Sequence, residues 1–532
     1  MAHKEMQEML RAAAILSVAS LIAKILSAFY RVPYQNLVGD TGFYVYQQIY
    51  PFYGIAMTFS LTGLPLFLSK VLQEEKEPYQ QNQILKTLFP IIFWVCVALF
   101  ALLFFASEPM AAAMGDVQLA GLIRVVAVMY LLTPPLAFLR GNFQGIPWMT
   151  PTALSQVGEQ FLRVAIIVLA AVLYKTSNWD VYQTASLAFL GGLGGGLLAL
   201  GILRHENRRT TLFRLRFTKD WWWVQDRKLL RPLLKRLVLE GGLVFLYSGL
   251  LLFYQLVDSF FVKEALVKGG LADGAAKIAK GVFDRSQPLV QLGLVVALAL
   301  GSTFLPMLTR QIVKKGQGAF QQYAMMFLRL TTILAVAATV GLWWLLPFMN
   351  YALFSDHQGM LTLAIFIAAI FLVALIQAYE NIMQSQNQLR IPLTGAILGL
   401  SIKLLTTNFL TEKFLTVGAS LSTILGLTVT LLYLARKAGP VLGRFYRYQH
   451  FLAKTLLALG TMSLVLGAFL LLVGPLAASS RTWSLLFSIV GVVIGAGSFL
   501  FMIIRLQIFT LREWLLIPFG KKILRLFQKN NL

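Results

Sequence analysis

Long apolar runs are the feature that most restricts what this chain can fold into. A helix that crosses a bilayer needs about 20 predominantly apolar residues. Fourteen runs of that kind lie at residues 12–33, 43–69, 85–106, 118–139, 153–174, 181–203, 237–262, 282–309, 321–348, 361–384, 392–410, 415–435, 451–474 and 483–507. Hydrophobic residues make up 58% of the chain and charged residues 13%, a balance that excludes a soluble enzyme with one anchor. We predict an all-α membrane protein with about fourteen transmembrane helices.

The charges between the runs predict the orientation of the chain. A net charge of +24 would indicate nucleic acid in a soluble protein, but most of these cations fall between apolar runs, as in cytoplasmic loops. Cations follow the second, eighth and twelfth runs at Lys70, Lys76, Lys86, Arg310, Lys314, Lys315, Arg436, Lys437, Arg444 and Arg447. We therefore expect both termini in the cytoplasm and no nucleic-acid partner.

Matching residues in the two halves predict an internal repeat. The pairs are Pro65 and Pro306, 241 positions apart, Asn142 and Asn381, 239 apart, and Arg163 and Lys403, 240 apart. Six helices separate the copies, so both halves enter the membrane in the same sense. Such repeats form two lobes around a central transport site. We expect lobes at 1–203 and 237–437, a basic linker at 204–236, two further helices within 438–507, and a basic tail at 508–532.

The linker and the tail combine cations with tryptophan. The linker carries eleven Lys and Arg residues together with Trp221, Trp222 and Trp223, and the tail carries Trp514. Basic segments with aromatic residues are typical of helices that lie on an anionic membrane surface. Anionic lipids are therefore expected partners. The alternative is that these cations only keep the two segments on the cytoplasmic side.

The first run contains a line of polar residues. Ser17, Ser20, Lys24, Ser27 and Arg31 are spaced 3, 4, 3 and 4 apart, which puts them on one face of a helix. A Lys or Arg near the bilayer centre costs at least ~2.5–3.5 kcal/mol, so such groups face protein or a water-filled cavity. One interpretation is that Lys24 and Arg31 bind phosphate oxygens, with Ser20 and Ser27 on the same water-exposed wall as candidates for binding the saccharide. The other is an ion pair with a carboxylate on another helix.

Four further groups each have a functional and a structural interpretation. Arg285 lies inside the eighth run and is a third cation for the substrate, or else the partner of Asp258 or Asp284. Asp258 is a ligand for a coupling ion, or else it neutralises a cation. On the second run, Tyr44, Gln47 and Gln48 offer hydrogen bonds to sugars, although Gln also joins helices inside membranes. Glu159 and Arg163, four residues apart, favour a structural ion pair on one helix.

The sequence offers no catalytic or metal-binding pattern. Cys96 is the only cysteine and the four histidines are scattered, so we expect no metal site and no cofactor. No phosphate-binding loop is present either. We therefore predict a transporter rather than an enzyme, driven by an ion gradient, the membrane potential or downstream consumption of its product.

The segment SLIAKILSAFYRVPYQNLVGDTGFYVYQQIYP at 20–51, the Asp284-Arg285 pair, the GSTFLP segment at 301–306 and the fourteen-helix plan resemble the MurJ-like lipid II flippases. These belong to the MOP (MATE-like) exporter superfamily, and the branch that includes the stage V sporulation protein B-like and YtgP-like transporters is the most similar. Two departures are Val32 after Arg31, where the family has Asp, and the absence of an arginine near Tyr53.

The resemblance implies a bacterial cell-membrane protein with two lobes around a cationic cavity. Lys24, Arg31 and Arg285 would bind the diphosphate of a lipid-linked saccharide, and the last two helices would hold its polyprenyl tail. The implied activity is translocation of an undecaprenyl-diphosphate-linked saccharide, with the peptidoglycan precursor lipid II as the first candidate, from the inner to the outer leaflet by alternating access. Cell-wall synthesis machinery is an implied partner. The alternatives are export of another lipid-linked polysaccharide and MATE-type antiport of drugs or cations.

Overall fold

The computed structural model describes most of the chain. The described residues are 29–75, 77–145, 148–177, 179–209, 219–223, 227–242, 249–443, 445–477 and 480–510, together with 16, 18–20, 22, 23, 25–27, 215, 245, 246, 513 and 514. No strand occurs among them, and the predicted all-α class is confirmed. Lys24 and Ser17 lie outside the described residues.

The first half of the chain forms six long helical segments. The first comprises the described residues from 16 onward and passes without a loop into α2 (Arg31–Thr58). Gly39 interrupts α2 with φ of 71°, a conformation that glycine adopts at no steric cost, so the first two predicted helices meet there. The others are α4 (Pro78–Phe105), α6 (Ala120–Ala127) with α7 (Met129–Gly145), α8 (Thr150–Ser177) and α9 (Val181–Arg209).

Shorter elements complete this half. A π-helical turn, η1 (Phe59–Gly63), continues α2 into α3 (Leu64–Glu74). The short helices α5 (Ser107–Ala113) and η2 (Val117–Leu119) precede α6. The basic linker contributes η3 (Lys219–Trp222), α10 (Arg227–Arg236) and η4 (Leu237–Gly241).

The second half repeats the plan and adds two helices. Its elements are α12 (Leu250–Lys268), α13 (Asp273–Asp284), α14 (Ser286–Phe354), α15 (Met360–Ile367), α16 (Ala369–Ser385), α17 (Arg390–Lys437), α18 (Gly439–Gly443), η5 (Phe445–His450), α19 (Phe451–Ala477) and α20 (Arg481–Arg505). Gly316 (φ 75°) divides α14 and Leu415 (φ 52°) divides α17, so each corresponds to two predicted helices.

The structure differs from the sequence prediction between residues 237 and 285. The described residues 237–242, 245 and 246 of the seventh predicted run are helical, and α12 covers the rest of that run from Leu250. An unpredicted helix, α13, follows it, and Arg285 lies at the junction of α13 and α14. Apolar length did not predict α13, because its two lysines and two aspartates leave no long apolar run.

Ten helices in the described part of the chain are long and apolar enough to cross a membrane. Two of the ten, Val18–Glu74 and Arg390–Lys437, each cover two of the predicted spans. A multi-pass membrane protein is therefore confirmed.

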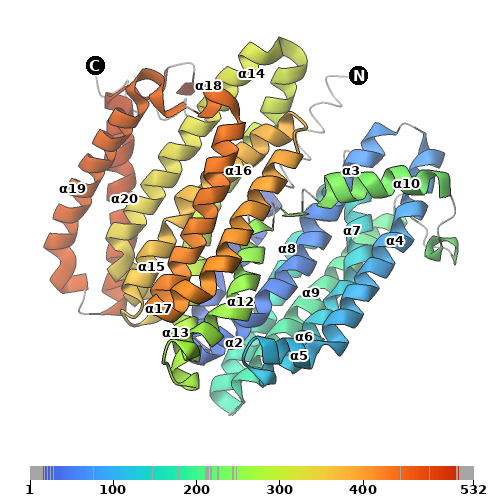
Figure 1. Cartoon of the computed structure of the whole chain (residues 1–532), viewed down its shortest axis with the longest axis horizontal. Helices are drawn as coiled ribbons and strands as arrows, with labels where there is room; N and C mark the ends of the chain where they lie inside the picture. The colour runs from blue at the N-terminus through green and yellow to red at the C-terminus, as the bar shows by residue number, and fades with distance from the viewer. Residues whose placement is uncertain are drawn as a thin grey trace. The chain divides into compact units, whose positions relative to one another are not determined.

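The helices group into two compact units. Unit 1 comprises 1–295, 361–366 and 387–430, and unit 2 comprises 296–360, 367–386 and 431–532. In unit 1, α8 and α9 pack side by side (Figure 1). A Cβ atom on Gly195 of α9 would lie 2.5 Å from the carbonyl oxygen of Glu159, so only glycine permits this approach. In unit 2, α19 and α20 pack along one another (Figure 1), with Gly495 against Leu466. The domain limits predicted from the sequence stay a prediction.

Candidate functional site: a buried arginine and tyrosine cluster

Arg31 is a buried cation beside the tyrosines of α2. Its side chain is 0% exposed, and none of its three guanidinium nitrogens donates a hydrogen bond within the described part of the chain. The guanidinium carbon lies 4.5 Å from the centre of the Tyr50 ring. A cation over an aromatic ring is attracted by the ring's negative face, but this attraction replaces only part of the lost hydration. Within the described part of the chain, the burial of the Arg31 charge is therefore only partly compensated.

Arg163 of α8 lies in a cage of tyrosines beside Arg31. It donates hydrogen bonds to the hydroxyl oxygens of Tyr30 (3.0 Å) and Tyr46 (3.1 Å). Its guanidinium carbon is 4.3 Å from the centre of the Tyr53 ring and 5.9 Å from that of Tyr50. The guanidinium groups of Arg31 and Arg163 therefore both lie near the Tyr50 ring.

The predicted ion pair between Glu159 and Arg163 is wrong. Glu159 instead accepts a 2.6 Å hydrogen bond from Nη2 of Arg140, and both side chains are buried. Arg140 comes from α7 and also donates to Ser155 Oγ and to the carbonyl oxygen of Ser60. The spacing along α8 would allow the predicted pair, but Arg140 reaches Glu159 from α7 while Arg163 donates to Tyr30 and Tyr46. Sequence reasoning missed Arg140, although it is a cation at the end of an apolar run.

The cluster as a whole carries excess positive charge. The cluster contains three buried arginines, Arg31, Arg140 and Arg163, and one buried carboxylate, Glu159. Glu159 forms an ion pair with Arg140. Five buried tyrosines lie around them, at positions 30, 34, 46, 50 and 53. Tyrosine supplies hydroxyl donors and flat apolar faces, which suit phosphate oxygens and sugar rings. We define this set of three arginines, Glu159 and five tyrosines as the arginine–tyrosine cluster.

Arg285 is not available as a third free cation. Its Nη2 atom lies 2.6 Å from Asp40 Oδ2 and its Nε atom 3.0 Å from Asp40 Oδ1. The predicted alternatives, Asp258 and Asp284, are therefore wrong as its partners. The left-handed turn at Gly39 brings Asp40 to Arg285, a meeting that the sequence did not indicate. The prediction that Arg285 is a structural ion pair holds, but with a different acid.

Asp258 and Asp284 each form an ion pair with a lysine instead. Nζ of Lys403 lies 2.6 Å from Asp258 Oδ1 and 2.7 Å from Thr423 Oγ1. Nζ of Lys280 lies 2.6 Å from Asp284 Oδ1. Both pairs are buried. Lys403 is the repeat counterpart of Arg163, so each half places one cation at this position.

The side chains proposed for sugar binding mostly contact protein. Gln48 donates to the carbonyl oxygen of Ser259, and Ser20 donates to Gln156 Oε1, each at 2.9 Å. Tyr44 donates to Asp116 at 3.3 Å. Gln47 is buried and its Oε1 has no donor in the described residues. Ser27 is half-buried. Of this group, Gln47 and Ser27 keep the most capacity for a ligand.

Asp116 forms a second polar cluster near α13. It accepts from Tyr182 at 2.8 Å and pairs with Lys277 at 2.9 Å, while Lys263 Nζ donates to the carbonyl oxygen of Gly115 and pairs with Asp273. Burial lowers the pKa of Lys277, but its hydrogen bonds to Tyr182 and Asp116 outweigh burial and raise it overall. The hydrogen bond from Lys263 lowers the pKa of Asp273. These charged forms are therefore mutually stabilising.

Comparison with known proteins places this geometry in context. A family described as polysaccharide biosynthesis protein matches residues 9–312. The chain is 34% identical over 531 residues to the uncharacterized membrane protein YabM of Bacillus subtilis (strain 168), covering 97% of this chain and 96% of YabM. It is 25% identical over 488 residues to the lipid II flippase MurJ of the same organism, covering 86% of this chain and 87% of MurJ. A solved structure of the lipid II flippase MurJ in an inward closed conformation matches with a TM-score of 0.64 at 13% identity, covering 93% of this chain and 99% of that chain. The predicted resemblance to MurJ-like proteins is confirmed.

Proposed function

Because the chain belongs to the polysaccharide biosynthesis protein family, we propose that it moves a saccharide linked to a polyprenyl diphosphate across the cell membrane. The first candidate substrate is lipid II, since two of the proteins that it resembles are named lipid II flippases. The direction of transport is from the inner to the outer leaflet, with both termini in the cytoplasm. Another lipid-linked polysaccharide would present the same diphosphate.

The buried guanidinium group of Arg31, which donates no hydrogen bond within the described part of the chain, carries this proposal. A charge buried without hydrogen bonds costs several kcal/mol, and an anion that binds it recovers this energy. A diphosphate offers the required anionic oxygens, and arginine binds phosphate through two parallel hydrogen bonds. Arg163 lies close enough to contribute to the same anion, since both arginines approach Tyr50. Lys24 is proposed as a further cation on the sequence pattern alone.

Release requires the protein to open, and three contacts within unit 1 would resist this. Arg285 pairs with Asp40, Lys277 pairs with Asp116, and Lys263 bonds to the carbonyl oxygen of Gly115. Each joins α12, α13 or the start of α14 to a segment from the first half of the chain. The predicted orientation puts these segments on the outer side, so we assign them to an outer latch. In alternating access the latch breaks as the substrate leaves.

Complementation in cells tests the proposed function. Cells depleted of their own lipid II flippase should grow with the parent chain but not with Arg31→Ala, and Arg31→Lys should rescue weakly because it keeps the charge without the planar fork. Arg124→Ala is the matched control, because Arg124 forms an exposed pair with Glu108. Immunoblots of membranes establish equal amounts of each variant. Full rescue by Arg31→Ala at equal abundance would contradict the proposal.

A further inference from the structure

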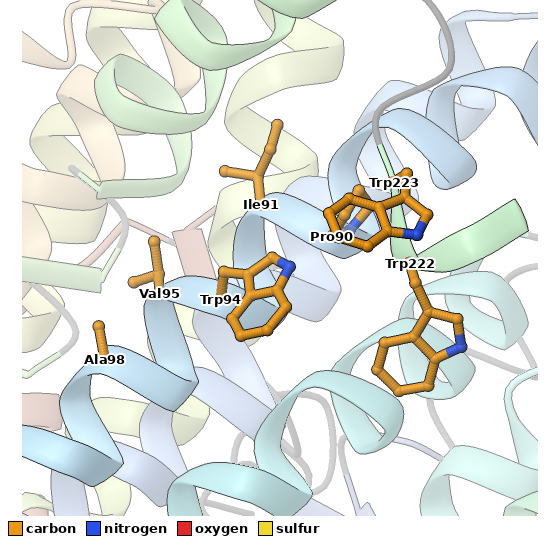
Figure 2. Close-up of a pocket in the computed structure, with 7 residues that line it drawn as sticks. All are labelled: Pro90, Ile91, Trp94, Val95, Ala98, Trp222 and Trp223. Carbon is orange, nitrogen blue, oxygen red and sulfur yellow. The ribbon is translucent and has the colours of Figure 1, made fainter. Parts of the chain in front are cut away.

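An apolar groove lies on unit 1, outside the arginine–tyrosine cluster. It has a volume of about 500 Å³ and is lined by Pro90, Ile91, Trp94, Val95, Ala98, Trp222 and Trp223. Figure 2 shows Trp94, Val95 and Ala98 following one another along α4, with Trp222 and Trp223 on the segment opposite. Trp94, Val95 and Trp223 are each more than half exposed. A volume of this size falls in the range of small-molecule sites.

The groove is built by a fixed contact between the linker and α4. Trp221 is buried, with its ring centre 5.5 Å from that of Phe89, and Trp222 lies edge-on to Phe93 at 4.7 Å. Trp221 thus anchors the linker, which leaves Trp222 and Trp223 displayed at the groove. Tryptophan favours the boundary between apolar and polar membrane regions, because its ring is apolar and its N–H donates a hydrogen bond.

A cationic helix packs on the same α4. Helix α10 contacts α4 and runs across the direction of α4 and α7 (Figure 1). Leu233 of α10 is buried, whereas Arg231 and Lys235 are exposed. Two acids of the described residues, Glu74 and Glu240, both pair with Arg236. The exposed face of α10 is therefore positive and without a local counter-ion among the described residues.

We propose that this groove binds an anionic glycerophospholipid. An acyl chain lies along the apolar wall of α4, and the phosphate is held at the membrane surface by the indole N–H groups of Trp222 and Trp223 and by Arg231 and Lys235. A neutral lipid would fill the groove equally well but would gain nothing from the cations. The bound lipid fastens the linker, which joins the two halves of the chain, to one membrane surface. The site shares no residue with the arginine–tyrosine cluster and does not depend on the proposed transport.

Native mass spectrometry of the full chain, released from nanodiscs with equal phosphatidylglycerol and phosphatidylcholine, tests the groove. The parent chain should retain phosphatidylglycerol in preference. Ala98→Trp fills the groove while leaving every charge in place, and should abolish this retention. Trp222→Phe with Trp223→Phe keeps an aromatic ring at each position and removes the N–H donors together with part of the ring area, so it should weaken retention without changing the melting temperature. Trp343→Phe with Trp344→Phe alters two partly exposed tryptophans elsewhere and should have no effect.

The same measurement tests the charge. Arg231→Gln with Lys235→Gln should remove the preference for phosphatidylglycerol, because each cation near an anionic lipid contributes roughly fivefold in affinity. Arg436→Gln with Lys437→Gln removes two exposed cations at the end of α17 and is the control. Equal retention of both lipids by the parent, or unchanged retention by Ala98→Trp, would overturn the proposal. So would retention of a polyprenyl diphosphate in place of phospholipid at this groove.

Discussion

Arg285 and Asp40 lie 245 residues apart in the chain, and their side chains meet in a two-pronged ion pair. The Arg285 side chain is fully buried and that of Asp40 is 14% exposed. The pair joins the junction of α13 and α14 to the turn at Gly39 in α2. The sequence suggested Arg285 as a cation for the substrate, whereas the ion pair with Asp40 makes it a structural link between the two halves of the chain.

Asp40→Asn should destabilise the protein strongly. Removing one partner of a buried ion pair leaves an uncompensated charge, which costs about 3–5 kcal/mol. The melting temperature in detergent should fall, and adding Arg285→Gln should restore part of the loss. Glu264→Gln is the control, because Glu264 and Lys268 form an exposed pair worth at most ~1 kcal/mol. Equal melting temperatures for the Asp40 and Glu264 variants would show that the pair does not hold this junction.

A double-mutant cycle should identify the true partner of Glu159. Glu159→Gln and Arg140→Gln should couple by about 0.5–3 kcal/mol, because their charges meet at 2.6 Å. Glu159→Gln and Arg163→Gln should be close to additive. Free energies of unfolding measured with the four variants of each cycle decide the matter. Stronger coupling to Arg163 would restore the pairing that the spacing on α8 suggested.

Gly195→Ala should disturb the packing of α8 and α9. The added Cβ would lie 2.5 Å from a backbone oxygen of Glu159, so the helices must separate at a cost of about 1–3 kcal/mol. Gly201→Ala on the same helix is the control, because a Cβ there meets nothing within 4 Å and alanine favours helix. The melting temperature should fall for the first variant and stay level or rise for the second. A fall of the same size in both would indicate a general intolerance of α9.

Apolar length and repeat spacing predicted the helices well, because bilayer thickness fixes how long each run must be. Partner choice was harder. The rule that residues four apart can pair considers a single helix, so it predicted Arg163 as the partner of Glu159. It could not predict Arg140, which belongs to α7. Asp40 lies between the first two predicted runs, and the kink at Gly39 beside it could not be foreseen from apolar length. For Arg31 the sequence offered a cation for phosphate or an ion pair with another helix, and the structure buries its side chain over the Tyr50 ring.

Binding of a polyprenyl-diphosphate-linked saccharide to the purified chain tests the central claim most directly. Microscale thermophoresis with a fluorescent lipid II analogue should give measurable affinity for the parent chain and for Arg124→Ala. Arg31→Ala should bind about 10–100-fold more weakly, the loss expected from hydrogen bonds to a charged group of roughly 1.5–3 kcal/mol. Undiminished affinity in a folded Arg31→Ala variant would contradict the account.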